Sequence, residues 1–439
     1  MSNSFRQSND RASAPPGLEP PDVVSPEARV PSSGAGSPAP PAERRSRLVG
    51  VDVARGLAVL GMFVVHVGVG WTLADGSNAL YPVAAGHSSV LFALLAGVSI
   101  ALLSGGVHRK VNKDLGVALW RVVVRGLVML VLGTALTMMG TPVSVILAYY
   151  AVFFVLTAML LTERWQMVAG TAALLGVVGP VVSFVVRGLI EDEGPLFGVV
   201  EAINSYDPFV ALADEGVVDF LLTGSYPAIT WMPFVLAGLA IGRLDLRSVR
   251  VRWLLVVSGF AVAGAAYGVS WLAMNVLGGA ERLAGGFDPL MGAAYGPAGL
   301  EEVLYEGFGG TVPTTDWVWL LTGAPHSGTP VEVFGSGGLA VAVLGVCLLV
   351  AQRLGVLVYP LMAVGALALT TYVGHILVIW VDEQGLVEGT PLSFVSEQLS
   401  LTILVGSLVG ATAWRALVGR GPLEWPLHAV SSWVATRIP

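Results

Sequence analysis

The sequence predicts an all-α polytopic membrane protein, a bundle of about ten transmembrane helices with both termini in the cytoplasm. Hydrophobic residues make up 54% of the 439 positions and charged residues only 12%, about half the charged share of a soluble domain. Apolar runs of about 20 residues, the length needed to cross hydrocarbon, recur along the chain. Basic residues gather in alternate connections between these runs, which is the positive-inside pattern.

Ten apolar stretches account for most of the chain. We expect spans near residues 48–71, 87–106, 119–140, 143–162, 167–189, 226–243, 252–277, 331–352, 356–380 and 397–418. They form one domain over residues 46–430. The end of the chain, residues 419–439, overlaps this domain and is expected to be a cytoplasmic C-terminal segment. Residues 1–45 are rich in Pro, Ser, Gly and Ala, cannot bury enough surface to fold, and are expected to be a disordered cytoplasmic tail.

Two connections on the outer side are long, over residues 190–225 and 278–330. The first is acidic, and the second combines glycines and acids with aromatic residues. We expect these aromatics to form a packed cap, with an interfacial aromatic belt as the alternative: Phe287, Tyr295, Tyr305, Phe308, Trp317 and Trp319.

The first span carries three ionisable residues, Asp52, Arg55 and His66. Charge inside a membrane is costly, so such residues are functional candidates by default. Arg55 and His66 are 11 residues apart, which places them on one helix face and about 16 Å apart along its axis. Asp52 shares that face. This stripe suits a long ligand with an anionic inner end and a reactive outer end; the alternative is an interfacial ion pair and a packing histidine.

Four of the six histidines fall in the outer half of the membrane or just beyond it, from different parts of the chain: His66, His87, His326 and His375. Histidine is the usual general base at neutral pH, so these four are the catalytic candidates. No Cys/His metal spacing accompanies them and the only cysteine is Cys347, so no metal site is expected.

On the inner side, arginines surround the openings between spans. Guanidinium groups suit phosphates through bidentate hydrogen bonds, although most of these arginines would serve only to set topology. Arg121 and Arg125 lie partly inside a helix, and with Asp52 and Arg55 they are the expected cofactor-binding residues. There is no basic stripe, so nucleic acid is not expected as a partner.

Several stretches together resemble a known group. RLVGVDVARGLAVLGMFVVHVG and SSVLFALLAGVSIALL resemble the opening of the YeiB-like and heparan-alpha-glucosaminide N-acetyltransferase-like membrane proteins. YPAITWMPFVLAGLAIGRLDL, PHSGTPVEVFGSGGLAV, GALALTTYVGHILV and GRGPLEWPLH look like the C-terminal half of the YeiB-like group. The resemblance runs from about residue 46 to 430.

The resemblance implies transmembrane acyl transfer. Acetyl-CoA or another acyl-CoA would bind from the cytoplasm as co-substrate, and a histidine near the outer face would assist transfer to an envelope glycan or glycolipid. It further implies a multi-pass protein of the bacterial plasma membrane, with membrane lipids as neighbours and a homodimer left open. In the glucosaminide acetyltransferases the active histidine lies between the first two spans. Here that loop has no histidine before His87, so the identity of the base stays open among the four.

Two other functions compete with an acyltransferase. Intramembrane Asp, Arg and His also suit a proton-coupled transporter or flippase of a lipid-linked substrate, but no self-similarity between the two halves supports it. A structural or sensory protein would explain the spans and leave the outer histidines without a role. We expect acylation to require His66 or His87, with His326 and His375 orienting the acceptor and backbone N–H groups near Gly335–Gly337, at a helix start, stabilising the oxyanion.

Overall fold

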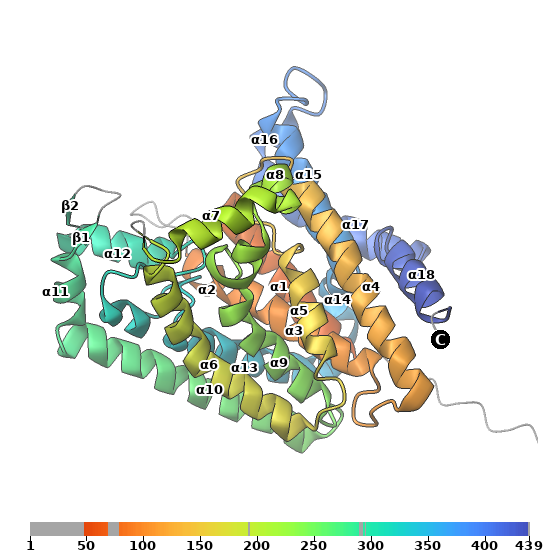
Figure 1. Cartoon of the computed structure of the whole chain (residues 1–439). Helices are drawn as coiled ribbons and strands as arrows, with labels where there is room; N and C mark the ends of the chain where they lie inside the picture. Colours follow the sequence, from red (N-terminus) through yellow and green to blue (C-terminus); the bar gives the residue numbers. More distant parts are fainter. Residues whose placement is uncertain (1–47, 69–78, 192–193, 289–292, 295, 438–439) are drawn as a thin grey trace, which may run out of the picture. The chain divides into compact units, whose positions relative to one another are not determined.

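The computed structural model describes residues 48–68, 79–191, 194–288, 293–294 and 296–437, and the predicted N-terminal tail lies outside them. The described part is an all-α helix bundle (Figure 1). Its helices are α1 (Val49–Val67), α2 (Tyr81–Ala84), α3 (His87–Leu103), α4 (Asn112–Thr137), α5 (Tyr149–Ala158), α6 (Trp165–Gly188), α7 (Phe197–Tyr206), α8 (Pro208–Ala213), α9 (Ala228–Gly242), α10 (Val249–Trp271), α11 (Gly279–Ala284), α12 (Gly296–Glu306), α13 (Pro330–Leu354), α14 (Tyr359–Ala366), α15 (Ala368–Glu383), α16 (Phe394–Glu397), α17 (Leu399–Leu417) and α18 (Glu424–Ala435).

Short helical turns and very short strands lie between these helices. Asp219–Thr223 and Leu272–Val276 are π-helical turns, and Trp317–Leu321 and Gly355–Val358 are 3₁₀ turns. The two-residue strands β1 (Phe287–Asp288) and β2 (Ala293–Ala294) pair antiparallel. They lie within the second long connection and leave the all-α class unchanged.

Within the described residues, seven helical stretches are long and apolar enough to cross a membrane. Two shorter apolar helices, α5 and α9, coincide with the fourth and sixth predicted spans. The expected ninth span, 356–380, is interrupted at Leu367 and divided between α14 and α15. The chain is therefore a multi-pass membrane protein, whereas the number of ten spans stays a prediction.

Helix α1 is the centre of the bundle, because it contacts α3, α13, α14, α15 and α17. Glycines let the helices approach closely, as is common in membrane bundles. A Cβ on Gly365 would lie 1.8 Å from the Asp52 carbonyl oxygen, and one on Gly238 would lie 1.9 Å from that of Leu94. Helices α14 and α1, and likewise α9 and α3, are thus held backbone to backbone.

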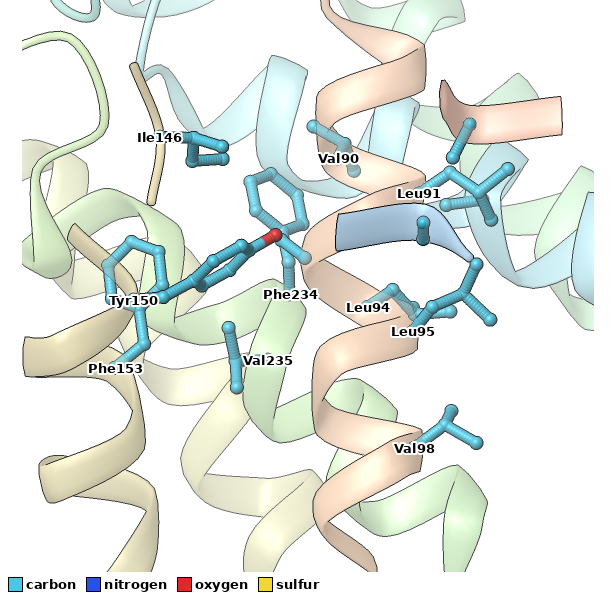
Figure 2. Close-up of a cluster of buried hydrophobic side chains, with 14 of the residues drawn as sticks. Val90, Leu91, Leu94, Leu95, Val98, Ile146, Tyr150, Phe153, Phe234 and Val235 are labelled. Carbon is cyan, nitrogen blue, oxygen red and sulfur yellow. The ribbon is translucent and has the colours of Figure 1, made fainter. Parts of the chain in front are cut away.

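The core between α3, α5 and α9 is almost entirely apolar. Figure 2 shows Tyr150 of α5 among Ile146, Phe153 and Val235, with α3 opposite. The Tyr150 hydroxyl is buried and has no hydrogen-bond partner among the described residues. A buried polar group without a partner is costly, so this hydroxyl calls for a functional explanation.

The second long connection is a packed cap, as the sequence predicts. Trp319 and Leu300 are buried in a second hydrophobic cluster with Phe184 of α6. Phe308 contacts the Trp319 ring, and Trp317 contacts the Phe184 ring. Of the aromatics predicted for this cap, Tyr295 and the side chain of Phe287 lie outside the described residues.

Candidate functional site

Arg55 is held in the first turns of α1 by groups from three helices. Its Nη1 donates to Asp52 Oδ1 at 3.0 Å and to the Gly365 carbonyl of α14 at 3.2 Å. Its Nη2 donates to Ser99 Oγ of α3 at 2.8 Å. The side chain keeps 21% of its surface exposed, whereas Asp52 is buried. The predicted Asp52–Arg55 pair is therefore a fixed cation with one open side.

That open side faces a cavity of about 190 Å³. Arg55, Arg125 and Glu424 lie on its wall together with Tyr150 and Tyr372, and the remaining lining is mostly apolar. The Glu424 carboxylate accepts hydrogen bonds from the Thr370 backbone N–H at 3.0 Å and its hydroxyl at 2.6 Å. We call this space the inner cavity.

Arg121, the fourth expected cofactor residue, does not line the inner cavity. It lies one turn before Arg125 on α4, close enough for the two charges to repel each other. The structure thus brings Arg55 and Arg125 to one space and leaves Arg121 beside it.

His66 and His375 form a direct pair, with His66 Nδ1 and His375 Nε2 3.0 Å apart. The other ring nitrogen of His375, Nδ1, is hydrogen-bonded to the Tyr372 carbonyl oxygen. A carbonyl only accepts, so His375 Nδ1 carries the proton and its Nε2 accepts from His66 Nδ1–H. In the neutral pair the free lone pair therefore lies on His66 Nε2, which makes His66 the base of the two.

Tyr372 joins the histidine pair to the inner cavity. Its ring lies 5.1 Å from that of His375, and the same residue lines the cavity below Arg55. Because α1 is continuous from Val49 to Val67, the axial separation of Arg55 and His66 is the predicted ~16 Å. The cationic end and the histidine end thus share one helix and one bridging side chain.

His326 lies in the loop before α13, stacked on Trp231 at 5.9 Å and edge-on to Tyr226 at 5.6 Å. Its φ of 52° is in the left-handed region, which is strained for a non-glycine residue. Partial burial, and then the nearby charge of His87, lower the pKa of His326 to about 4. The ring is therefore neutral at physiological pH.

Glu332 of α13 holds the His326 loop in this conformation. Its carboxylate is 2% exposed and accepts from the backbone N–H of His326 at 2.6 Å and of Gly328 at 2.7 Å. The Ser327 hydroxyl donates to it at 3.3 Å. Thr329 caps the helix by accepting from the Glu332 N–H, so the T-x-x-E sequence forms a variant of the capping box.

His87 begins α3 and belongs to a second chain of hydrogen bonds. Its Nε2 lies 3.0 Å from the Tyr267 hydroxyl of α10, which in turn lies 3.0 Å from Ser336 Oγ of α13. The Tyr267 ring rests on Gly335, where a Cβ would come within 2.6 Å of Tyr267 Cζ. Gly335 is therefore needed for the tyrosine to reach His87.

All four predicted histidines gather at one end of α1. His326 is close enough to His66 for their charges to interact, and His87 is close enough to His326 for theirs to interact. Within the described residues no three His, Cys, Asp or Glu side chains meet as metal ligands would. The arrangement is a set of imidazoles near His66.

One expectation about the oxyanion is wrong. Helix α13 begins at Pro330, so Gly335–Gly337 lie inside it and not at its start. Their N–H groups belong to the hydrogen bonding of the helix interior. The part that Gly335 plays is steric, through the Tyr267 contact described above.

The acidic outer connection also reaches this end of the bundle. Glu215 Oε1 accepts from the Tyr149 hydroxyl at 3.2 Å, and the Tyr149 ring contacts that of Tyr226. The other carboxylate oxygen, Oε2, is buried and has no hydrogen-bond partner among the described residues. Burial is the main reason that the pKa of Glu215 is raised to about 7.

This shift predicts a pH-dependent stability. The folded-state pKa exceeds the ordinary value of 4.5, so the protonated carboxyl stabilises the fold below pH 4.5 and this contribution is lost as pH rises through about 7. We expect the melting temperature to fall between about pH 4.5 and 7, and Glu215→Gln to remove that part of the fall. Glu201→Gln, on an exposed residue of α7, is the control; identical profiles for the wild type and the Glu215 variant would contradict the assignment.

Sequence reasoning missed Glu332, Tyr267 and Tyr372. The T-x-x-E pattern before an apolar run was a readable signal for Glu332. The two tyrosines had none, because their roles depend on contacts between α10, α13 and α15 that local sequence does not encode.

A comparison with known families matches residues 309–434 to the model described as "Protein of unknown function (DUF418)". This is the YeiB-like family, so the matched C-terminal part of the chain is similar to the group that its motifs resemble. No curated protein matches the chain. The match covers His326, Glu332, His375 and Glu424, so both ends of the candidate site include residues of the family region.

Proposed function

We propose that this protein is an acyltransferase of the bacterial plasma membrane. It would take an acyl group, most simply acetyl, from cytoplasmic acyl-CoA and transfer it to a hydroxyl or amine of an extracytoplasmic glycan or glycolipid. The observation that carries the proposal is the His66–His375–Tyr372 chain, which leaves a lone pair on His66 Nε2. Arg55 lies on the same helix, about 16 Å from His66 along the helix axis.

The inner cavity suits the extended arm of acyl-CoA. At about 190 Å³ it is smaller than the pockets that enclose drug-sized ligands, which start near 300 Å³, so it would hold a chain and leave the nucleotide at the cytoplasmic mouth. Arg55 and Arg125 supply positive charge for phosphate or carbonyl oxygens. The unpartnered Tyr150 hydroxyl would gain a partner in an amide of the arm.

The chemistry follows from the tautomers. His66 Nε2 removes the proton of the acceptor hydroxyl or amine while the acceptor oxygen or nitrogen bonds to the thioester carbonyl carbon. The carbon–sulfur bond then breaks, and the proton passes from His66 to the sulfur, so that CoA leaves as a thiol. His375 holds the charged imidazolium by accepting its Nδ1–H, while His326 and the His87–Tyr267 pair would orient the acceptor.

Purified protein incubated with labelled acetyl-CoA and an envelope extract tests the proposal. We expect label to appear in the glycan or glycolipid fraction, and CoA alone to raise the melting temperature. Absence of both effects, together with substrate-dependent uptake into vesicles, would favour a proton-coupled carrier instead.

Gly335→Ala is expected to weaken transfer by about two- to tenfold. The new Cβ would displace the Tyr267 ring and break its hydrogen bond to His87, an interaction worth about 0.5–1.5 kcal/mol. Gly268→Ala on α10 is the matched control, because a Cβ there meets nothing within 4 Å. Equal transfer rates for the two variants would show that the Tyr267–His87 contact has no part in the reaction.

A further inference from the structure

A groove of about 510 Å³ runs between α4 and α18, outside the inner cavity. It is lined entirely by apolar side chains, among them Val128, Val131 and Leu132 of α4 and Leu427 and Val430 of α18. Val131 is 72% exposed and Val430 46% exposed. The groove thus has the composition of a site for a hydrocarbon chain.

A cluster of cationic and imidazole groups lies at one end of this groove. His428 of α18 is close enough to Arg121, Arg125 and Arg420 for their charges to interact. Arg125 Nε donates to Ser431 Oγ at 3.4 Å, and Arg121 Nε is buried with no hydrogen-bond partner in the described part of the chain. We call these four residues the α4–α18 cluster.

The cluster and the groove form one continuous surface. Arg121, Arg125, Val128 and Leu132 follow one another at spacings of four, three and four residues, so they share one face of α4. On α18, His428 follows Leu427 of the groove and precedes Ser431, the hydrogen-bond partner of Arg125. An occupant can therefore contact the cations and the apolar wall at once.

Negative charge to balance this cluster is not supplied by the protein. Among the described residues, none of the three arginines forms an ion pair with a carboxylate. The nearest acid in sequence on α18, Glu424, is already bound by Thr370. Three guanidinium groups at one site without a counterion indicate an anionic ligand.

Helix α18 has the features of a helix at the membrane surface. Trp425 and Trp433 are 60% and 57% exposed, and exposed tryptophan is typical of the boundary between lipid and water. Arg437 lies over the Trp433 ring at 4.1 Å. These tryptophans favour a position of α18 near the membrane boundary, where phospholipid headgroups are found.

We propose that the α4–α18 groove binds an anionic phospholipid, with the phosphate on Arg121, Arg420 and His428 and an acyl chain along Val128 and Leu132. This goes beyond the proposed acyl transfer and does not depend on it. A nucleotide phosphate is the competing source of anion, but beyond the cations the groove offers it no polar partner for a base or sugar.

Native mass spectrometry of the full-length protein, equilibrated with phosphatidylglycerol or with phosphatidylcholine of the same acyl chains, tests the proposal. We expect tighter retention of phosphatidylglycerol, by about fivefold for each arginine engaged. The double variant Arg121→Gln/Arg420→Gln should retain both lipids equally. Leu132→Trp, which fills the groove, should weaken retention of both. Arg250→Gln/Arg353→Gln, on basic residues of other segments, is the matched control.

The outcomes separate lipid from nucleotide. Equal retention of both lipids by the wild type, or unchanged preference in the Arg121/Arg420 variant, would overturn the proposal. So would displacement of phosphatidylglycerol by CoA, because the cluster would then belong to a nucleotide site. If the double variant does not fold, Arg420→Gln alone gives the same comparison at an exposed residue, with an expected loss of about fivefold.

Discussion

His66→Ala lowers acyl transfer by about 10²–10⁴-fold, the usual contribution of a general base, and leaves the amount of folded protein in the membrane unchanged. The expected size follows from the hydrogen-bond chain, in which His375 accepts from His66 Nδ1–H and leaves Nε2 free. The measurement is the transfer rate from labelled acetyl-CoA at saturating concentration, with membrane abundance measured on the same samples.

Two further variants, at His375 and at His108, complete this test. His375→Ala should also slow transfer, by less than the loss of His66, because His66 would keep its ring but lose its fixed tautomer. His108→Ala, on an exposed residue after α3, should have no effect. Wild-type rates in the His66 variant would remove His66 as the base and leave His87 as the remaining candidate.

Glu332→Ala lowers the free energy of unfolding by about 2–6 kcal/mol, because two backbone N–H groups lose their acceptor and each costs about 1–3 kcal/mol when left unpaired and buried. The donors are those of His326 and Gly328. The loop would leave its left-handed conformation at His326, so transfer should fall along with stability.

Glu332→Gln separates the two effects. The amide keeps one acceptor oxygen, so it should recover part of the stability but position His326 less well. Glu302→Ala, at an exposed carboxylate of α12, is the control for unfolding measurements. A Glu332→Ala protein as stable as the wild type would mean that the loop is held by other contacts.

The helices could be predicted from the sequence, but the breaks within them could not. Apolar length predicts where long helices form, because crossing lipid requires about 20 apolar residues regardless of what surrounds them. The break at Leu367 has no such signal. It follows from the packing of α14 on α1, where Gly365 meets the Asp52 backbone, and a contact between distant segments cannot be read from either one alone.

The residue types of the site could be predicted from the sequence, but the contacts between these residues could not. Arg55 and His66 could be placed on one face because helical spacing fixes that geometry. The partner of His66 could not be chosen among three other histidines, since α15 brings His375 to it from 309 residues away. Arg121 was assigned to the cofactor with Arg125 from proximity in sequence, whereas only Arg125 lines the inner cavity.

The proposed transfer requires one passage that connects the inner cavity with the histidines. Because the chain has a single cysteine, this passage can be tested by cysteine labelling. In a Cys347→Ala protein, which has no other thiol, Phe63→Cys would place one sulfur beside His375, 4.5 Å away between ring centroids in the wild type. A pyridyl disulfide of CoA, added only to the cytoplasmic face of sealed vesicles, is predicted to form a mixed disulfide at position 63, and Leu147→Trp in the cavity wall should prevent it. Labelling of Ser99→Cys near Arg55 without any labelling at position 63 would show that the passage is closed and would contradict the account.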